Sequence, residues 1–232
     1  MKRILPLVLT ITLLPLVLLF CTAVYVGQNF AATRPGDSLQ AEQPSGWIRL
    51  FDGKTLEGWE GNEEFFRVQD EAIVAGNLEK KIPHNEFLCT EKVYKDFELR
   101  LEAKLIGEGK NAGIQFRSQR IPNHHEVKGY QCDMGQMKGH SIWGYLYDES
   151  RRRKFLVEAD ARLTDKNTRE GEWNEFVLRC EGKRIQIWLN GFRTVNYVET
   201  GENIDQQGII GLQIHGGPPA EAWYRNIRIK KL

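Results

Sequence analysis

The chain has 232 residues, and its 32 Lys and Arg residues nearly balance its 31 Asp and Glu residues, for a formal net charge of +1. Because proteins that bind nucleic acid usually carry a clear excess of basic residues, this balance predicts no nucleic-acid partner. The length predicts one large β domain, which is big enough to bury a hydrophobic core.

The N-terminus combines Met1-Lys2-Arg3 with an apolar stretch from residue 4 to residue 26. A basic start followed by an apolar run is typical of an export signal, and Thr22-Ala23 precedes a position suited to cleavage. The stretch is also long enough to span a bilayer, so an uncleaved anchor at residues 4–26 is the alternative. We therefore expect an exported protein (periplasmic, cell-surface or secreted) that contacts a membrane only through this segment.

The chain divides into three parts by composition. Residues 1–26 form the signal or anchor, residues 27–45 are rich in Gln, Ala, Pro and Gly and predict a linker, and residues 46–232 form the domain.

Strand patterns dominate the domain, with apolar and polar residues alternating along several segments. These segments cover residues 97–105, 112–119, 130–134, 176–198, 210–215 and 223–231. Asn190-Gly191 is a strong hairpin signal, and it predicts a three-stranded meander from residue 176 to residue 198. The last strand is expected to pair with an early one. With no helix of convincing length, the pattern predicts an all-β, two-sheet antiparallel β-sandwich or jelly roll.

Two of these strands direct an unusual set of polar groups to one side. Gln115 and Arg117 alternate with apolar neighbours, and Gln131 and Asp133 do the same. A solvated face would favour Lys, Glu and Thr, whereas amides with one guanidinium and one carboxylate are more typical of a sugar or polyol site.

Three cysteines lie in the domain, at Cys89, Cys132 and Cys180. An odd number excludes a fully paired disulfide framework, and we predict buried free thiols. No Cys-x-x-Cys or His-x-x-x-His spacing supports a structural zinc site.

The segment GWIRLFDGKTLEGW at residues 46–59 resembles the opening of the 3-keto-disaccharide hydrolase family. Further blocks follow in the family's order, which are DFELRLEAKL at 96–105, NAGIQFRS at 111–118, GYQCDMG at 129–135, WGYLYDESRR at 143–152, GEWNEF at 171–176, LNG at 189–191, GIIGLQIHGG at 208–217 and YRNIRIKKL at 224–232. Gln131-Cys132-Asp133 replaces the Glu-Val-Gln that many members have. The resemblance implies a concanavalin- or laminin-G-like jelly roll and two activities on 3-keto-glucosides, a 1,2-lyase and a hydratase, which sum to glycoside hydrolysis.

This chemistry defines the groups that the site must supply. A ketone at C3 acidifies the hydrogen on C2, so a base near C2 can form an enolate that expels the group on C1. Asp133 is the first candidate base, provided that burial raises its pKa; a surface or calcium-binding Asp is the alternative. Arg117 is the candidate for holding the enolate oxygen or a hydroxyl, and an ion pair with Asp133 is its alternative.

Four further side chains are candidates for the site. His215 is predicted to act as an acid, a base or a metal ligand, with a structural role beside its Gly-Pro turn as the alternative. Asp148 or Glu149 would supply a second carboxylate and Arg152 a substrate-binding group, unless this segment is only a solvated turn.

The remaining candidates would bind the sugar rather than react with it. Trp143 would stack on a pyranose ring, with core packing as the alternative. Gln115, Gln131 and Gln213 would bond hydroxyl groups, with cross-strand amide pairing as the alternative.

Two functions are therefore weighed. The first is a lyase or hydrolase acting on a keto-sugar substrate, and a separate dehydrogenase would supply the ketone because the chain has no Gly-x-Gly-x-x-Gly site. The second is a non-catalytic, lectin-like carbohydrate-binding module, since this fold hosts both enzymes and lectins. A wall- or membrane-attached interaction domain is a more distant third.

No cofactor is evident. A divalent cation held by Asp133 or His215 stays open, because no ligand spacing indicates it.

Overall fold

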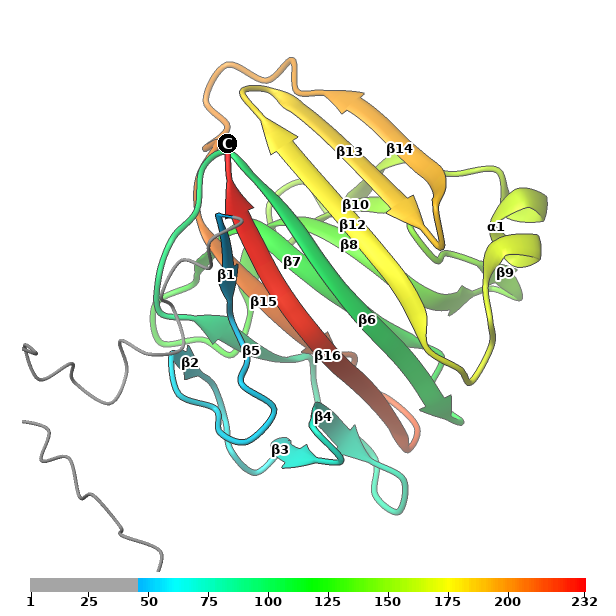
Figure 1. The fold of residues 1–232 in the computed structure, drawn as a ribbon. Coiled ribbons are helices and arrows are strands. Elements are labelled where there is room, and N and C mark those ends of the chain that lie inside the picture. Colours follow the sequence, from blue (N-terminus) through cyan, green and yellow to red (C-terminus); the bar gives the residue numbers. More distant parts are fainter. Residues whose placement is uncertain (1–45) are drawn as a thin grey trace, which may run out of the picture. The chain divides into compact units, whose positions relative to one another are not determined.

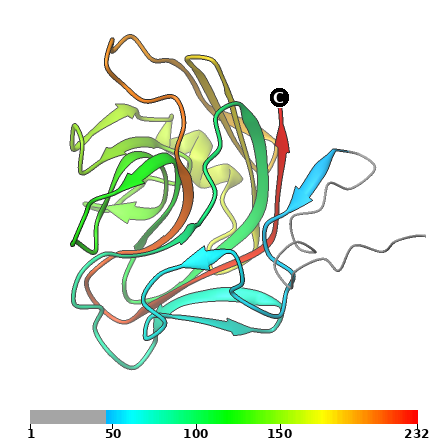
Figure 2. The same ribbon diagram turned by 90° about the vertical axis from the view of Figure 1, so that its left-hand side faces the viewer.

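The computed structural model describes residues 46–232, which form two eight-stranded antiparallel sheets packed face to face (Figures 1 and 2). The first sheet contains β1 (Trp47–Arg49), β3 (Phe66–Gln69), β4 (Ala72–Asn77), β6 (Phe97–Gly107), β12 (Asn174–Glu181), β13 (Arg184–Leu189), β14 (Phe192–Val198) and β16 (Ala220–Lys231). The second contains β2 (Trp59–Glu60), β5 (Glu86–Thr90), β7 (Asn111–Arg120), β8 (Val127–Met137), β9 (His140–Ser141), β10 (Leu146–Glu149), β11 (Lys154–Val157) and β15 (Ile209–Ile214). The predicted all-β sandwich is confirmed.

The strand order shows how distant segments meet. The first sheet runs β14-β13-β12-β6-β16-β4-β3 with β1 beside β16, and the second runs β11-β10-β8-β7-β15-β5-β2 with β9 beside β8. The final strand β16 therefore lies between β6 and β4, which confirms that the end of the chain closes the fold. The three-stranded meander of β12, β13 and β14 is also confirmed, and Asn190 and Gly191 turn at φ 48° and 81°, in the left-handed region that this hairpin needs.

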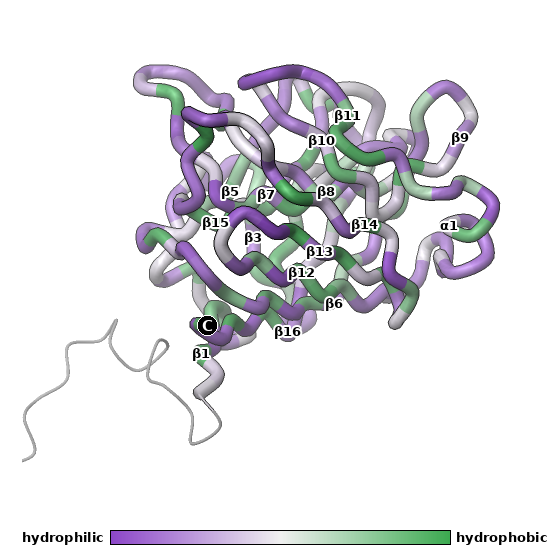
Figure 3. The backbone as a smooth tube through the Cα atoms, turned by 90° about the horizontal axis from the view of Figure 1, so that it is seen from above, coloured by the Kyte–Doolittle hydropathy of each residue, from purple (hydrophilic) through white to green (hydrophobic). Residues whose placement is uncertain are grey.

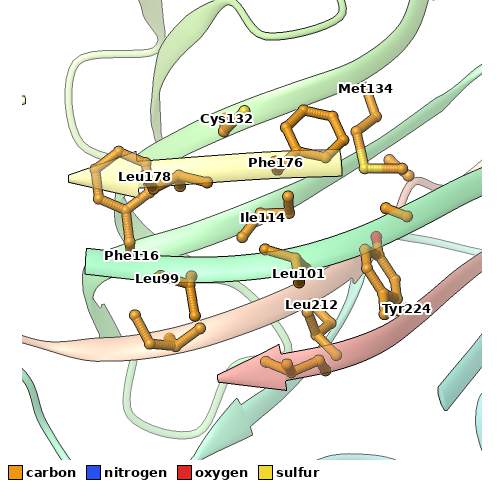
Figure 4. Close-up of a cluster of buried hydrophobic side chains, with 14 of the residues drawn as sticks. Leu99, Leu101, Ile114, Phe116, Cys132, Met134, Phe176, Leu178, Leu212 and Tyr224 are labelled. Atoms are coloured by element: carbon orange, nitrogen blue, oxygen red, sulfur yellow. The ribbon is translucent and has the colours of Figure 1, made fainter. Parts of the chain in front are cut away.

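The core forms because alternate residues of each sheet face the other sheet. Along β6 buried and partly buried residues alternate, and Leu101 pairs with Phe176 of β12. Figure 3 shows hydrophobic and hydrophilic residues alternating along β6, β12 and β16. Figure 4 shows the side chains of both sheets meeting in one cluster, where Leu99, Leu101, Ile114, Phe116, Cys132, Met134, Phe176, Leu178 and Leu212 are buried.

Tyr224 links the two sheets by hydrogen bonds as well as by packing. Its ring is buried in the core, and its hydroxyl lies 2.6 Å from the carbonyl oxygen of Gln213 and 3.2 Å from that of Gly113. Tyr224 belongs to the first sheet, whereas Gln213 and Gly113 belong to the second. The bond therefore anchors β15 and β7, the strands beneath the polar surface considered below.

The cysteines and the near absence of helix agree with the sequence pattern in residues 46–232. Cys89, Cys132 and Cys180 are buried and free, as predicted. One short helix, α1 (Ala161–Asn167), begins after Asp160, whose side chain accepts the backbone N–H groups of Arg162 and Leu163. Within residues 46–232 no helix is long and apolar enough to cross a membrane. The predicted signal or anchor and the predicted linker lie outside the described residues.

Candidate active site

The outward side of the second sheet carries a set of buried polar side chains. Because Cys132 and Met134 of β8 face the core, Gln131 and Asp133, which alternate with them, face away from it. In the strand register, Gln115 of β7 is opposite Gln131 of β8. Gly113 of β7 is opposite Asp133 on one side and opposite Gln213 of β15 on the other. Gln115, Gln131, Asp133 and Gln213 are each at most 4% exposed.

Three of these side chains form a directed chain of hydrogen bonds that ends on the carboxyl group. The Ser118 hydroxyl donates to Oε1 of Gln115 at 2.7 Å, and Nε2 of Gln115 donates to Oε1 of Gln131 at 2.5 Å. Nε2 of Gln131 then donates to Oδ1 of Asp133, also at 2.5 Å. Each amide uses its oxygen on one side and its nitrogen on the other, so the chain fixes the orientation of both amides. The predicted alternative of cross-strand amide pairing is thus confirmed for Gln115 and Gln131.

Glycine makes room for this chain. A Cβ atom on Gly113 would lie 2.6 Å from Cδ of Gln131, so the Gln131 side chain occupies the space over Gly113. Gly211 is opposite Gln115, and a Cβ there would lie 3.0 Å from Cβ of Gln115. The two small residues thus allow long amide side chains to lie flat across the sheet.

Two carboxyl groups on this surface have pKa values that differ from their ordinary range and from each other. Burial raises the pKa of Asp133 to about 8, opposed by the Gln131 hydrogen bond and reinforced by the charge of Glu149. Burial, with help from Glu126, raises the pKa of Glu149 to about 6, against hydrogen bonds from Ser150. Near neutral pH Asp133 is therefore mostly protonated and Glu149 mostly ionised, the division of roles that an acid and a base require.

Tyr147 lies between these two carboxyl groups. On β10, Tyr147 is opposite Gln131, and Glu149 is opposite Gly129. Asp133, Gln131 and Gly129 follow one another at every second position of β8, so the row that holds Tyr147 separates the row of Asp133 from the row of Glu149. Burial raises the pKa of Tyr147, and the charges of Glu149 and Asp133 raise it further. Tyr147 and Glu149 are only partly buried, so the surface is accessible from the β10 side. The proximity of Tyr147 to Asp133 has no signal in the sequence, because it depends on the pairing of β8 with β10.

Gln213 is the one member of the set without partners. Neither its amide nitrogen nor its amide oxygen has a hydrogen bond within the described part of the chain, although the side chain is 0% exposed. A buried amide without partners costs about 1–3 kcal/mol, so such groups are normally satisfied by water or a ligand. Gln213 can therefore offer one donor and one acceptor to a bound molecule.

Glu126 joins the edge of the surface to the loop that precedes β8. The Ser150 hydroxyl donates to Oε2 of Glu126 at 2.7 Å, and Nδ2 of Asn85 donates to its Oε1 at 3.3 Å. Nδ1 of His125 lies 3.1 Å from the carbonyl oxygen of Asn85. Glu126 thus contacts the residue next to Glu149 and contributes to the raised pKa of that carboxyl group, a role that no motif in the sequence indicated.

Arg117 does not reach this surface, so the expected juxtaposition with Asp133 is wrong. A β-bulge follows Phe116, and Arg117 has φ 47°, which ends the alternation that the prediction assumed. Its buried guanidinium donates to Oδ1 of Asp96 at 2.9 Å. Its remaining bonds go to the carbonyl oxygens of Lys95 and Gly182 and to Oε1 of Gln206. Arg117 is therefore fixed between loops at one end of the sandwich.

Asp148 and Arg152 form a buried ion-pair network, so the alternative of a solvated turn is also wrong. Asp148 is 0% exposed and pairs with Arg151 and Arg152. Arg152 also pairs with Glu199 at 2.7 Å, and the Tyr130 hydroxyl donates to the same carboxylate at 2.6 Å. Because Asp148 alternates with Glu149 along β10, only Glu149 lies on the outward surface with Asp133.

Trp143 lies apart from the polar set, whereas His215 stands two residues after Gln213, just beyond the end of β15. Trp143 is 5% exposed and stacks on Phe176 with ring centroids 6.0 Å apart, so the core-packing alternative is confirmed. His215 follows the end of β15, is exposed, and has Nδ1 2.7 Å from the carbonyl oxygen of Gly216. Among residues 46–232 no group of three or more His, Cys, Asp or Glu side chains is placed to hold a metal ion.

An antiparallel sandwich that carries paired carboxyl groups and amides on one outward face suits a protein that handles a polar small molecule such as a sugar. The chain belongs to the family described as the 3-keto-alpha-glucoside-1,2-lyase-like domain, whose sequence profile matches residues 46–230. The family resemblance noted from the sequence blocks is thereby confirmed.

Individual relatives agree with this assignment. The chain is 24% identical over 245 aligned positions to a 3-keto-disaccharide hydrolase of Bacteroides thetaiotaomicron, covering 84% of this chain and 82% of that protein. A proposed glycosyl hydrolase of Parabacteroides distasonis superposes with a TM-score of 0.59 at 19% identity, covering 82% of this chain and 96% of that one. The carbohydrate-binding module CBM66 of Bacillus subtilis gives 0.55 at 15% identity, covering 74% and 94%. At these identities the two solved structures establish the fold alone.

Proposed function

We propose that this protein cleaves 3-keto-glucosides or 3-keto-disaccharides by 1,2-elimination followed by hydration, which together amount to glycoside hydrolysis. The observation that carries the proposal is the pair of carboxyl groups on one outward face, Asp133 with a pKa of about 8 and Glu149 with a pKa of about 6. Family membership and the 3-keto-disaccharide hydrolase relative support the substrate class.

In the elimination step Glu149 is the base and Asp133 the acid. The Glu149 carboxylate takes the proton from C2, the C2 electron pair forms the C1=C2 double bond, and the C1–O bond breaks. Asp133 gives its proton to the departing oxygen. This assignment reverses the role that the sequence analysis gave to Asp133, because its pKa is raised so far that it holds a proton near neutral pH.

The hydration step returns both groups to their starting state. Asp133, now ionised, removes a proton from water as the oxygen adds to C1, and Glu149, whose carboxyl proton exchanges with solvent between the steps, delivers a proton to C2. Protons balance over the two steps, and the ketone at C3 is unchanged. The Gln131 amide, which donates to Asp133, stabilises its ionised form between the steps.

A neutral amide takes the place of the Arg117 guanidinium, which was expected to hold the C3 oxygen of the substrate. Gln213 has an unused donor within this surface, and we assign it to the C3 oxygen or an adjacent hydroxyl. A neutral donor stabilises the enolate less than a guanidinium does, but it costs less to bury beside a protonated Asp133.

The reaction would take place outside the cytoplasm, on a keto-sugar made by another enzyme. The apolar stretch at residues 4–26 supports export, with or without retention as an anchor, and the missing dinucleotide motif supports a separate dehydrogenase as the source of the keto-sugar. A non-catalytic sugar-binding role is the alternative that the fold permits. It is less well supported, since Trp143, the aromatic residue proposed for stacking, packs in the core.

The test is to incubate the full-length protein with 3-keto-trehalose in deuterated water and to follow the products by NMR, with and without EDTA. Release of glucose together with deuterium at C2 of the keto-sugar is the expected result. Release that survives EDTA would show that the side chains suffice without a divalent cation. Tight binding of plain glucosides without any release would contradict the proposal and support the binding module.

A further inference from the structure

Three arginines lie in one row across the outward face of the first sheet, on the opposite side of the molecule from Asp133. Arg49 of β1 pairs in register with Arg228 of β16, and Arg228 pairs with Arg100 of β6. These three strands lie side by side at the front of Figure 1. Neighbouring strands are about 4.8 Å apart, so the row spans roughly 10 Å. Like charges directly opposite each other destabilise a sheet, so such a row requires compensation.

The compensation within the described residues is incomplete. Arg100 pairs with Glu98 at 2.6 Å. The guanidinium groups of Arg100 and Arg228 lie 5.2 Å and 5.5 Å from the ring centre of Trp47, a weaker form of stabilisation. Among residues 46–232 neither Arg49 nor Arg228 has a carboxylate partner within ion-pair distance, and Glu102, which pairs with Arg225, acts on Arg228 only through its more distant charge. Both guanidinium forks are therefore available to a ligand.

The row borders a cavity of about 840 Å³. Trp47 and the three arginines line it, together with Asp52 and Glu71. This volume falls within the range of small-molecule sites. The cavity therefore combines two free guanidinium groups and an aromatic ring with two carboxylates, which can accept hydrogen bonds from hydroxyl groups.

We propose that this cavity binds an acidic saccharide, a sugar that carries a carboxylate or sulfate group, at a site separate from the proposed active site. The anionic group would lie between Arg49 and Arg228, where guanidinium forks bind carboxylate or sulfate oxygens in pairs. The hydroxyl groups would face Asp52 and Glu71. A nucleic acid fits poorly, since a row of only three cations, roughly 10 Å long, cannot follow a long run of phosphates.

The site would add a binding function to the proposed catalytic one. Because it lies on the other sheet, a saccharide held there does not compete for the surface around Asp133. The protein would stay attached to an acidic glycan while acting on keto-sugars from its surroundings. The inference does not depend on the proposed reaction, because no residue of the cavity belongs to the second sheet.

Calorimetric titration of the full-length protein tests the proposal, with an oligogalacturonate tetramer, a sulfated dextran oligosaccharide and the uncharged dextran oligosaccharide of equal length. Both acidic probes should bind at least about tenfold more tightly than the uncharged one, and raising NaCl from about 0.05 M to about 0.5 M should weaken them. The double substitution Arg49→Gln and Arg228→Gln should lower their affinity at least about tenfold. Arg184→Gln, which changes an exposed arginine of β13 in the same sheet, should have little effect.

Three results would overturn the proposal. Equal binding of charged and uncharged probes would remove the role of the arginines, and an equal loss in Arg184→Gln would reduce the effect to general charge attraction. Inorganic sulfate that binds as tightly as the sulfated oligosaccharide would leave an anion site without a sugar. Turnover of 3-keto-trehalose should be unchanged in Arg49→Gln, and saccharide binding should be unchanged in Asp133→Asn, so the two proposals can fail separately.

Discussion

Gln131 donates its side-chain amide to Oδ1 of Asp133 at 2.5 Å, from a position two residues earlier on the same strand. The bond is the last link of a chain that starts at Ser118 and passes through Gln115, so the carboxyl group is oriented before any substrate arrives. The bond also lowers the pKa of Asp133, yet burial dominates and the pKa is about 8. The amide chain therefore orients an acid without ionising it, and the first two predictions rest on that balance.

Replacing either carboxyl group should abolish most of the activity. Asp133→Asn and Glu149→Gln should each lower turnover of 3-keto-trehalose at least about a hundredfold, the usual scale for a general acid or base. In the unmodified protein kcat/KM should rise as pH passes about 6, where Glu149 loses its proton, and fall as pH passes about 8, where Asp133 loses its own. The pH profile of the residual activity of Glu149→Gln should lack the acidic limb, and a profile that keeps this limb would contradict the assignment.

Asp133→Asn should make the protein more stable at alkaline pH while it lowers activity. The folded-state pKa of Asp133, about 8, lies above its unfolded value of about 3.9, so between these values the folded state holds a proton that the unfolded state has released. Stability therefore falls as pH rises through this window, and Asn, which does not ionise, avoids the loss. Melting temperatures should differ little at pH 4, and the advantage of the variant should grow up to about pH 8. An advantage that does not change with pH would show that Asp133 is not protonated in the folded state.

Gly113→Ala should disturb the amide chain more than the fold. The new methyl group would lie 2.6 Å from Cδ of Gln131, a flexible side chain that can move away but would then release Asp133. We expect turnover to fall at least about tenfold, with a loss of stability of about 1 kcal/mol, which is typical of a single substitution. The measurements are kcat and the urea midpoint of the same preparation. Unchanged turnover would show that the Gln131 bond does not position the acid.

Arg117→Ala should act on stability and not on the chemical step. The change removes a buried guanidinium that bonds Asp96, Gln206 and two backbone carbonyl groups, a loss that we expect to cost about 3 kcal/mol. For a domain of this size the melting temperature should drop by about 6–12 °C. Turnover per folded molecule at low temperature should stay within about threefold of the unmodified protein, and Gln119→Ala, two positions along β7, is the control. A hundredfold loss of turnover with unchanged melting would restore Arg117 to the active site.

The sequence predicted a large part of the fold because its signals are local. Alternation along residues 97–105 needs no knowledge of the partner strand, and Asn190-Gly191 specifies its turn by backbone conformation alone. The odd number of cysteines in the domain correctly pointed to free buried thiols. The same alternation failed at Arg117, since a β-bulge depends on how the neighbouring strand is paired and leaves no signal in the periodicity.

For the site, the sequence by itself determined which residue types were present and that Gln115, Gln131, Asp133 and Gln213 would each alternate with core residues of their own strand, since period-two alternation sets the side of a strand. Only the tertiary structure decided which of them act together. The register of β8 against β10 brings Tyr147 and Glu149 to the surface of Asp133, and it turns Asp148 inward to Arg151 and Arg152. Burial then sets the pKa of each carboxyl group, and burial is a property of the folded chain. The row of Arg49, Arg228 and Arg100 has the same origin, since residues far apart in the chain become neighbours only when the sheet forms.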